Sequence, residues 1–283
     1  NAASRAGVNA AASARSTTAM EYDTLASSLT RVLRADAAAF TPARLAALTP
    51  DALAAWFAPH DLPNAAERTR VLHEVAAVLE AQFDGAAINV LRQARHSAVT
   101  AVRLLTERFP NFRDEAVYRG AHVFLYKRAQ ICVADMWAAY GQQLHPASAA
   151  PCAFADIDRL TCFADYRIPQ LLAHLGAMRY STPLAAAIAE KRVLDPGSAW
   201  EVEIRAATVV AVSRLRRMVQ ARLHGGAGAD VAAGAGAGSG AAVASVTAVT
   251  AVTAVEIDWL LWQRGEAVKD AIAPHHRVDT IFY

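Results

Sequence analysis

One charged side chain, Asp165, stands where it could do chemistry. Asp165 lies between Phe163 and Tyr166, just before a helix that Pro169 can begin. A carboxylate held in this way can orient or deprotonate a water and can stabilise a cationic transition state. A lysine or arginine nearby can hold a phosphate, and an aromatic ring can stack on a base. The same pattern also fits an ordinary structural turn.

Several further charged residues adjoin strongly apolar sequence, where charge is costly unless it is paired or functional. They are Arg128, Asp156, Asp158, Arg167, Glu203, Arg205 and Asp258. On pattern alone we favour structural ion pairs between helices for this set. A capping box with Ser198 and a partner at Arg205 would explain Glu201. Glu203 and Arg205 have no equally complete local explanation.

The cysteines and histidines form no pattern that is typical of a metal site or a disulfide scaffold. The three cysteines, at positions 132, 152 and 162, form no Cys-x-x-Cys pair, which favours reduced thiols in an intracellular protein. The nine histidines are scattered apart from His275 and His276. No His-Glu-x-x-His spacing occurs. We therefore expect neither a metal nor another cofactor.

The overall composition favours a globular, helical protein. The chain has 283 residues, of which 54% are hydrophobic and many are alanine. A net charge of +2 argues against a stable nucleic-acid partner, because proteins that follow phosphate backbones need clustered cations. The uncharged stretch 231–255 is too weakly apolar to insert well into a membrane, so we expect no membrane span.

Helix signals recur along the chain. Thr-Pro pairs at 41–42, 49–50 and 182–183 are typical of helix starts. Asn64 with Glu67 predicts a capping box for a helix that ends at 84–85. Further helices are predicted over 87–109, over a stripe from Leu125 to Tyr140, from Pro169 to Gly176, from Ser198 to Gly225, and over 257–268. One edge strand is predicted within 277–283.

Two segments lack the pattern of a packed core. Residues 1–20 are rich in Ala and Ser and contain arginines but no acid, which fits a disordered leader or an organelle transit peptide. Residues 225–255 are of low complexity and are predicted to form a disordered Gly/Ala-rich insertion loop. We therefore expect an all-α fold in which residues 21–283 form a single globular domain.

Five motifs together resemble the queuosine salvage family of queuosine 5'-phosphate N-glycosylase/hydrolases. In chain order they are LYKRAQICVADMW, FADIDRLTCFADYRIPQLLAHLG, EVEIRAATVVAV, IDWLLW and HHRVDTIFY. The resemblance covers about Leu62 to Tyr283 apart from the insertion, whereas residues 20–60 fit more loosely. It implies a fold similar to helix-hairpin-helix DNA glycosylases. It also implies hydrolysis that releases queuine for salvage into tRNA modification.

The same resemblance implies roles for particular residues. Lys127 and Asp165 are the expected catalytic pair: Asp165 would activate water, and Lys127 would attract the 5'-phosphate or hold Asp165 ionised. The remaining residues would bind substrate: a carboxylate for the cationic amine of queuine, a ring to stack on the base, and arginines for the phosphate or diol. The candidates are Asp258 and Glu203, then Trp262, then Arg205 and Arg167, with Asp158 as a further polar contact.

A function from another class stays open at this point. The chain could be a non-catalytic binding module that holds a modified nucleotide or a nucleic acid with the same basic and aromatic groups. The near-neutral charge argues against a nucleic acid. We expect a monomer that acts on a small molecule in the cytoplasm, with organelle import through residues 1–20 as an alternative location.

Overall fold

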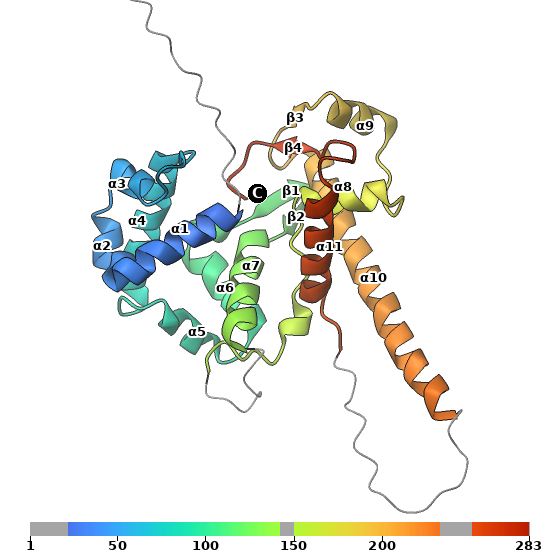
Figure 1. Cartoon of the computed structure of the whole chain (residues 1–283), viewed down its shortest axis with the longest axis horizontal. Helices are drawn as coiled ribbons and strands as arrows, with labels where there is room; N and C mark the ends of the chain where they lie inside the picture. The colour runs from blue at the N-terminus through green and yellow to red at the C-terminus, as the bar shows by residue number, and fades with distance from the viewer. Residues whose placement is uncertain (1–21, 142–149, 233–250, 283) are drawn as a thin grey trace, which may run out of the picture. The chain divides into compact units, whose positions relative to one another are not determined.

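The computed structural model describes residues 22–141, 150–232 and 251–282, and α-helices predominate among them (Figure 1). The prediction of a mainly helical protein is therefore confirmed. The chain forms two compact units, Asn1–Ala86 and Ala87–Tyr283. No helix in the described ranges is long and apolar enough to cross a membrane. The predicted leader at 1–20 and the central part of the predicted insertion, 233–250, lie outside the described residues.

The first unit contains short helices whose starts follow the predicted signals. Its elements are α1 (Tyr22–Ala35), η1 (Ala37–Phe40), α2 (Pro42–Ala46), α3 (Pro50–Ala55) and α4 (Ala65–Gln82). Thr49 caps α3 by accepting a hydrogen bond from the Ala52 backbone N–H. The capping box predicted at Asn64 is wrong, because Asn64 is left-handed and its side chain makes no capping bond. Glu67 instead pairs with Arg70 on the surface of α4.

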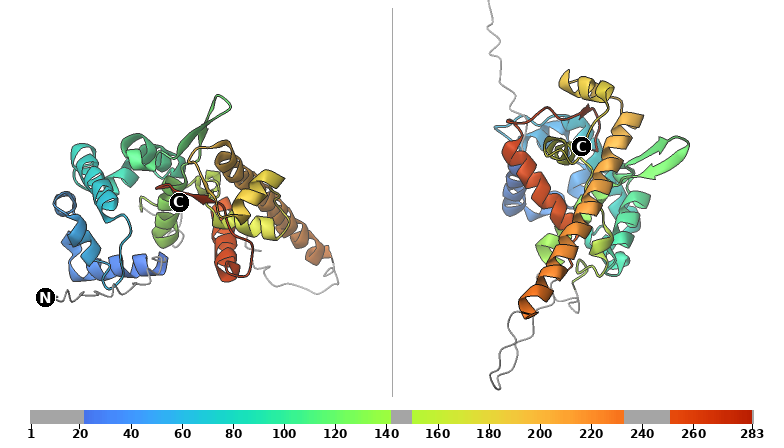
Figure 2. Two further views of the ribbon diagram at one scale, coloured as in Figure 1. Left: turned by 90° about the horizontal axis from the view of Figure 1, so that it is seen from above. Right: turned by 90° about the vertical axis from the view of Figure 1, so that its right-hand side faces the viewer.

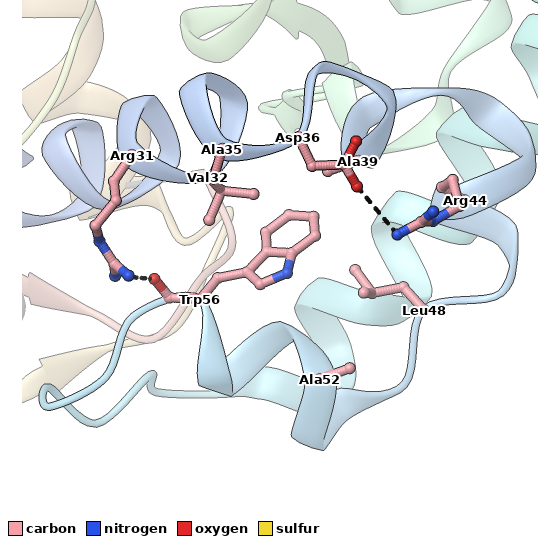
Figure 3. A pocket seen from close by; sticks show the side chains of 9 residues that line it. All are labelled: Arg31, Val32, Ala35, Asp36, Ala39, Arg44, Leu48, Ala52 and Trp56. Atoms are coloured by element: carbon pink, nitrogen blue, oxygen red, sulfur yellow. Dashed lines mark hydrogen bonds and ion pairs between the residues drawn. The ribbon is translucent and has the colours of Figure 1, made fainter.

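Trp56 lines a cavity of about 310 Å³ in this unit. Figure 3 shows its indole lying between Val32 of α1 and Leu48. The Arg31 guanidinium donates to the Trp56 carbonyl at 2.6 Å, and Arg44 pairs with Asp36 at 3.2 Å. Both arginines at this cavity are therefore engaged by groups of the same unit.

The second unit contains the remaining elements. Its helices are α5 (Ile88–Ala94), α6 (Ala98–Arg108), α7 (Lys127–Met136), α8 (Arg167–His174), α9 (Thr182–Ala189), α10 (Ala199–Ala232) and α11 (Ala254–Val268). Short helical turns occur at η2 (Pro110–Phe112), η3 (Trp137–Gly141) and η4 (Ile157–Arg159). The strands are β1 (Glu115–Tyr118), β2 (Ala121–Phe124), β3 (Val193–Leu194) and β4 (Arg277–Val278).

The helix predicted over 87–109 is in fact two helices, α5 and α6. Arg95 and His96 adopt positive φ angles and end α5. Ser97 then caps α6, while the Asp156 carboxylate accepts hydrogen bonds from the Ser97 hydroxyl and the Ala98 backbone N–H. A contact with a residue nearly 60 positions away in the sequence thus fixes this break. Local helix propensity could not reveal it.

A β-hairpin that the sequence patterns did not predict precedes α7. Strands β1 and β2 pair antiparallel and are joined at Arg119 and Gly120, which both have positive φ. Two such residues are typical of the tight turns that match strand twist. The hairpin projects from the rest of its unit (Figure 2). The apolar helix face predicted from Leu125 to Tyr140 is wrong at both ends. Leu125 lies before α7, and Tyr140 is exposed in a π-helical turn.

Helices α8, α10 and α11 pack together around one hydrophobic cluster of this unit (Figure 1). Buried members of this core are Cys162, Ile168, Leu172, Val212, Ala254 and Ile257. Ser198 precedes α10 as predicted, but the helix continues past Gly225 to Ala232. Residues 225–232 are therefore helical and do not belong to a loop. The predicted edge strand is confirmed at β4, which pairs in parallel with β3.

We predict that Thr253→Ala destabilises the second unit by about 1 kcal/mol, because it removes the capping box of α11. The Thr253 hydroxyl accepts from the Glu256 backbone N–H, and the Glu256 carboxylate accepts from the Thr253 backbone N–H. Urea unfolding would measure the loss. Ser181→Ala is the matched control, since the Ser181 side chain makes no capping bond to α9. Equal effects of the two changes would contradict the prediction.

Candidate active site

Asp114 positions Lys127 at the first turn of α7. The Asp114 carbonyl accepts hydrogen bonds from the backbone N–H groups of Leu125 and Tyr126. Its carboxylate Oδ2 accepts another from the Lys127 backbone N–H at 3.0 Å. The start of β1 and the start of α7 are thereby held together across the hairpin. Lys127 is buried as a result, with 8% of its surface exposed.

Asp165 is both a helix cap and a buried charge. Its Oδ1 accepts from the backbone N–H groups of Arg167 and Ile168, at 2.9 and 3.0 Å, and so fixes the first turn of α8. Among the described residues, every hydrogen bond to this carboxylate reaches Oδ1, which leaves Oδ2 for other interactions. Only 6% of Asp165 is exposed. The structural turn and the chemical carboxylate considered for this residue are therefore compatible.

Asp258 reaches the same segment from α11. Its Oδ2 accepts a hydrogen bond from the Phe163 backbone N–H at 2.7 Å. Asp258 is 3% exposed. A second buried carboxyl group therefore contacts the short segment that contains Asp165. The charges of Lys127 and Asp165 influence each other's pKa, and both also influence the pKa of Asp258. These three residues form one electrostatic cluster, which we call the Lys127–Asp165–Asp258 cluster.

Burial shifts the pKa of every member of this cluster. It raises the pKa of Asp165, against the opposing effects of the Lys127 ammonium and the Ile168 and Arg167 backbone N–H groups. It lowers the pKa of Lys127, while the Asp165 carboxylate opposes that change. It also raises the pKa of Asp258 to about 8, and the negative charge of Asp165 adds to the rise. At neutral pH Asp258 therefore holds a proton, whereas Lys127 and Asp165 each favour the ionised form of the other.

A buried ion-pair network supports the cluster from α10. The Arg205 guanidinium binds both carboxylate oxygens of Asp114, and its Nη1 also donates to Glu201 at 3.0 Å. Its Nε donates to the carbonyl of Ala164, the neighbour of Asp165. Arg205 thus joins α10 to the residues that position Lys127 and Asp165. These contacts are structural ion pairs of the kind that the sequence pattern favoured.

Arg167 is held in a second network at the start of α8. Its guanidinium donates to Glu266 at 2.6 Å and to Gln170 at 2.5 Å. The Gln170 amide in turn donates to the Ala273 carbonyl, which fastens the C-terminal segment to α8. The Arg167 side chain passes against Gly265, where an added Cβ would lie 2.8 Å from Arg167 Cγ. Any larger residue at this point of α11 would therefore force the Arg167 side chain to shift.

Of the other predicted substrate contacts, Trp262 lies on the same helix as Asp258, whereas Glu203 and Asp158 make their contacts elsewhere. Trp262 follows Asp258 by one helical turn, so the two share a face of α11. Glu203 is two residues from Arg205, about 200° around α10, and it accepts a hydrogen bond from the Tyr118 hydroxyl at the protein surface. Asp158 is exposed in η4, where its backbone carbonyl accepts from Arg216.

Sequence reasoning missed Asp114, His275 and Gln130. Asp114 was hidden because its partner Arg205 is 91 positions away. His275 stacks against Tyr166 with ring centroids 4.4 Å apart, and the adjacent histidines were the only signal for it. The Gln130 amide oxygen accepts from the Thr161 backbone N–H at 2.8 Å. Within the described residues, no group of three or more His, Cys, Asp and Glu side chains could hold a metal ion.

Comparisons with known proteins agree on one family. The model of the family described as queuosine salvage protein matches residues 4–283. A queuosine 5'-phosphate N-glycosylase/hydrolase from Dictyostelium discoideum is 39% identical over 264 residues, covering 93% of this chain and 72% of that protein. The protein of the same name from Sphaerobacter thermophilus is 38% identical, and the match again covers 93% of this chain and 72% of that protein. The Mus musculus protein of that name is 31% identical over 224 residues, covering 78% of this chain and 59% of its own length.

We predict that Asp114→Asn lowers the free energy of unfolding by about 3 kcal/mol, because it leaves the buried Arg205 guanidinium without its bidentate partner. Urea unfolding followed by circular dichroism would measure the loss. Glu107→Gln is the matched control, since it breaks the exposed pair between Arg103 and Glu107 and should cost less than about 1 kcal/mol. A loss of less than about 1 kcal/mol for Asp114→Asn would contradict the buried network.

The raised pKa of Asp258 predicts a particular dependence of stability on pH. The folded pKa of about 8 lies above the value of about 3.9 for an unfolded aspartate, so the folded protein keeps a proton that the unfolded chain releases. The contribution of Asp258 to stability is therefore fully present below about pH 4 and is lost as pH rises toward 8.

The variant Asp258→Asn, which cannot titrate at this position, should lack that contribution. Between about pH 5 and 8 its free energy of unfolding should rise relative to the wild type by roughly 1 kcal/mol per pH unit. Urea unfolding across this range would measure the difference. Asp270→Asn, at an exposed carboxyl just beyond α11, serves as the control. Parallel stability curves for Asp258→Asn and the wild type would overturn the prediction.

Proposed function

We propose that this chain, which belongs to the queuosine salvage protein family, hydrolyses the N-glycosidic bond of queuosine 5'-phosphate and releases queuine for salvage. One observation carries this proposal: relatives named for that reaction are 38–39% identical over 93% of the chain. The buried Lys127–Asp165–Asp258 cluster supplies groups suited to the reaction within the matched region.

The proposed chemistry centres on Asp165. Cleavage of a glycosidic bond passes through a transition state that resembles an oxocarbenium ion, with positive charge at the anomeric carbon. The carboxylate Oδ2 of Asp165 would stabilise that charge and deprotonate the attacking water, while Oδ1 stays bound to the first turn of α8. Because Oδ1 is held by two backbone hydrogen bonds, the carboxylate cannot rotate without breaking them, and Oδ2 stays in a fixed position.

Lys127 would act on the same carboxylate through its charge. A buried ammonium favours the ionised form of Asp165, which the low-polarity surroundings otherwise disfavour. Lys127 could also attract the 5'-phosphate of the substrate. Both roles need a charged lysine, and the negative charge of Asp165 favours that form of Lys127. The pair therefore functions as a unit in this proposal.

We propose that Asp258 and Trp262 form the base subsite. Asp258 is protonated near neutral pH and so can donate a hydrogen bond to the base as well as accept one. The cationic amine of queuine would favour the ionised form of Asp258, which couples binding of the base to release of this proton. Trp262, on the same face of α11, would stack on the base.

The other predicted substrate contacts are revised by their positions. Arg205 and Arg167 bind protein carboxylates, a carbonyl and an amide, so we propose that they position Asp165 and leave the phosphate to other groups. Glu203 lies on the opposite face of α10 from Arg205, and we leave it and the exposed Asp158 out of the site.

We also propose five further properties of this protein. They are a fold similar to helix-hairpin-helix DNA glycosylases, a single domain over 21–283, a monomeric state, a cytoplasmic location and the lack of a stable nucleic-acid partner. The rival function, a non-catalytic binding module for a modified nucleotide, is favoured by no observation. A catalytic assay separates it from hydrolysis directly.

We predict that Asp165→Asn lowers the rate of queuine release from queuosine 5'-phosphate by at least about 100-fold, because an amide cannot act as the base. The asparagine oxygen can still accept the backbone hydrogen bonds of α8, so the fold should persist. Mass spectrometry would quantify free queuine, and thermal unfolding would test the fold.

Glu203→Gln is the control for this experiment, since it makes the same change of acid to amide at an exposed position. It should keep nearly the full rate. A folded Asp165→Asn variant with nearly wild-type turnover would refute the role of Asp165. A wild-type protein that binds the nucleotide without turnover would instead support the binding module.

A further inference from the structure

A second cavity lies along the C-terminal half of α10. It has a volume of about 340 Å³. Its floor is one continuous stripe of the helix, since residues 216, 220 and 224 follow each other at four-residue spacing and 217 lies beside them. Its side walls come from η4 and from the segment that leads into α11. The lining residues that matter below are Asp158, Arg216, Arg217, Gln220, His224 and Val252.

Hydrogen bonds hold both walls of this cavity to its floor. The Arg216 guanidinium donates to the Asp158 carbonyl at 3.2 Å. On the other side, the Val252 backbone N–H donates to the Gln220 side-chain oxygen at 2.7 Å. Three segments that are far apart in the sequence are therefore fixed around one hollow.

The charge around this cavity is positive. The sequence of α10 contains no acid between Glu203 and Asp230, whereas arginines occupy positions 214, 216, 217 and 222. Within the described ranges no carboxylate forms an ion pair with Arg216 or Arg217, and Asp158 contacts Arg216 through its backbone carbonyl alone. His224 also lines the cavity, and its Nδ1 donates to the Gln220 carbonyl at 2.9 Å. Asp158 is the one acidic residue among those that line the cavity, so its lining holds two arginines to one carboxylate.

We propose that this cavity binds the phosphate group of a small phosphate monoester. Guanidinium groups match the geometry of phosphate oxygens and bind them with charge-assisted hydrogen bonds. Arg216 and Arg217 are adjacent on α10 and can bind one phosphate together, while His224, about two turns further along, can contact the rest of the ligand. Asp158, an acceptor-bearing residue of the cavity lining, can accept hydrogen bonds from hydroxyl groups, which favours a sugar phosphate over free inorganic phosphate.

This site is separate from the Lys127–Asp165–Asp258 cluster. Arg216 is eleven residues beyond Arg205 on α10, a rise of about 16 Å along the helix. Arg205 lies in the part of α10 that is next to the cluster, since it donates to the Ala164 carbonyl. The proposal therefore does not depend on the hydrolysis proposed above, and either can fail without the other.

Calorimetric titration of the full chain at constant ionic strength tests the proposal, with ribose 5-phosphate and inorganic phosphate as separate ligands. The variant is Arg217→Gln, because this exposed side chain lines the cavity without holding a wall. The matched control is Arg222→Gln, which removes an exposed arginine of the same helix that does not line the cavity. We expect Arg217→Gln to weaken binding by about tenfold or more and Arg222→Gln to leave it unchanged.

Hydrogen exchange identifies which site is occupied. Ligand should slow exchange in peptides that cover 216–224 and 251–253 in the wild type but not in Arg217→Gln. Queuine release should be the same in both. Tighter binding of ribose 5-phosphate supports a sugar phosphate as ligand, and equal binding supports inorganic phosphate in the same site. The proposal is overturned if neither ligand binds, if Arg217→Gln binds as tightly as the wild type, or if protection appears only around Lys127 and Asp165.

Discussion

The buried pair between Arg205 and Asp114 is the interaction on which the proposed active site depends. Asp114 holds the starts of β1 and α7 together, and Arg205 reaches from α10 to Asp114, Glu201 and the Ala164 carbonyl. A buried ion pair gives little net stability over an apolar replacement, yet removing one partner is costly. Its effect here is therefore to fix geometry: two guanidinium contacts set where Lys127 and Asp165 lie relative to each other.

Charge balance explains why this interior can hold so many ionisable groups. Among the described residues, three buried cations accompany four buried carboxyl groups: Lys127, Arg167 and Arg205 with Asp114, Asp165, Glu201 and Asp258. The pKa of Asp258 is raised to about 8, which favours its neutral form near neutral pH and so lessens the excess of acidic groups. Burial also raises the pKa of Asp165, and the charge of Lys127 opposes that rise.

Features that depend on neighbouring residues could be predicted from the sequence, whereas features that depend on contacts between distant segments could not. Helix starts such as Thr49 before Pro50 were predictable, because the cap and its partner lie within one turn. The break at Arg95 and His96 was not, since Asp156 caps α6 from a separate segment. The hairpin was missed although Gly120 marked a break, because each of its strands has only four residues, too few for a clear periodic pattern. Lys127 and Asp165 came from motif resemblance, whereas Asp114 shows itself only through a partner 91 positions away.

Helix α10 carries two environments along its 34 residues, and their difference has a physical origin. Near its start, Glu201 and Arg205 are buried, so each charge must be paired within the protein, and the pairs become rigid. Further along, the helix reaches the surface, where arginines remain hydrated and need no carboxylate partner. The same residue type therefore acts as a fixed structural tie at position 205 and as an available cation at position 217. Burial, rather than the sequence of the helix, decides which of these roles an arginine takes.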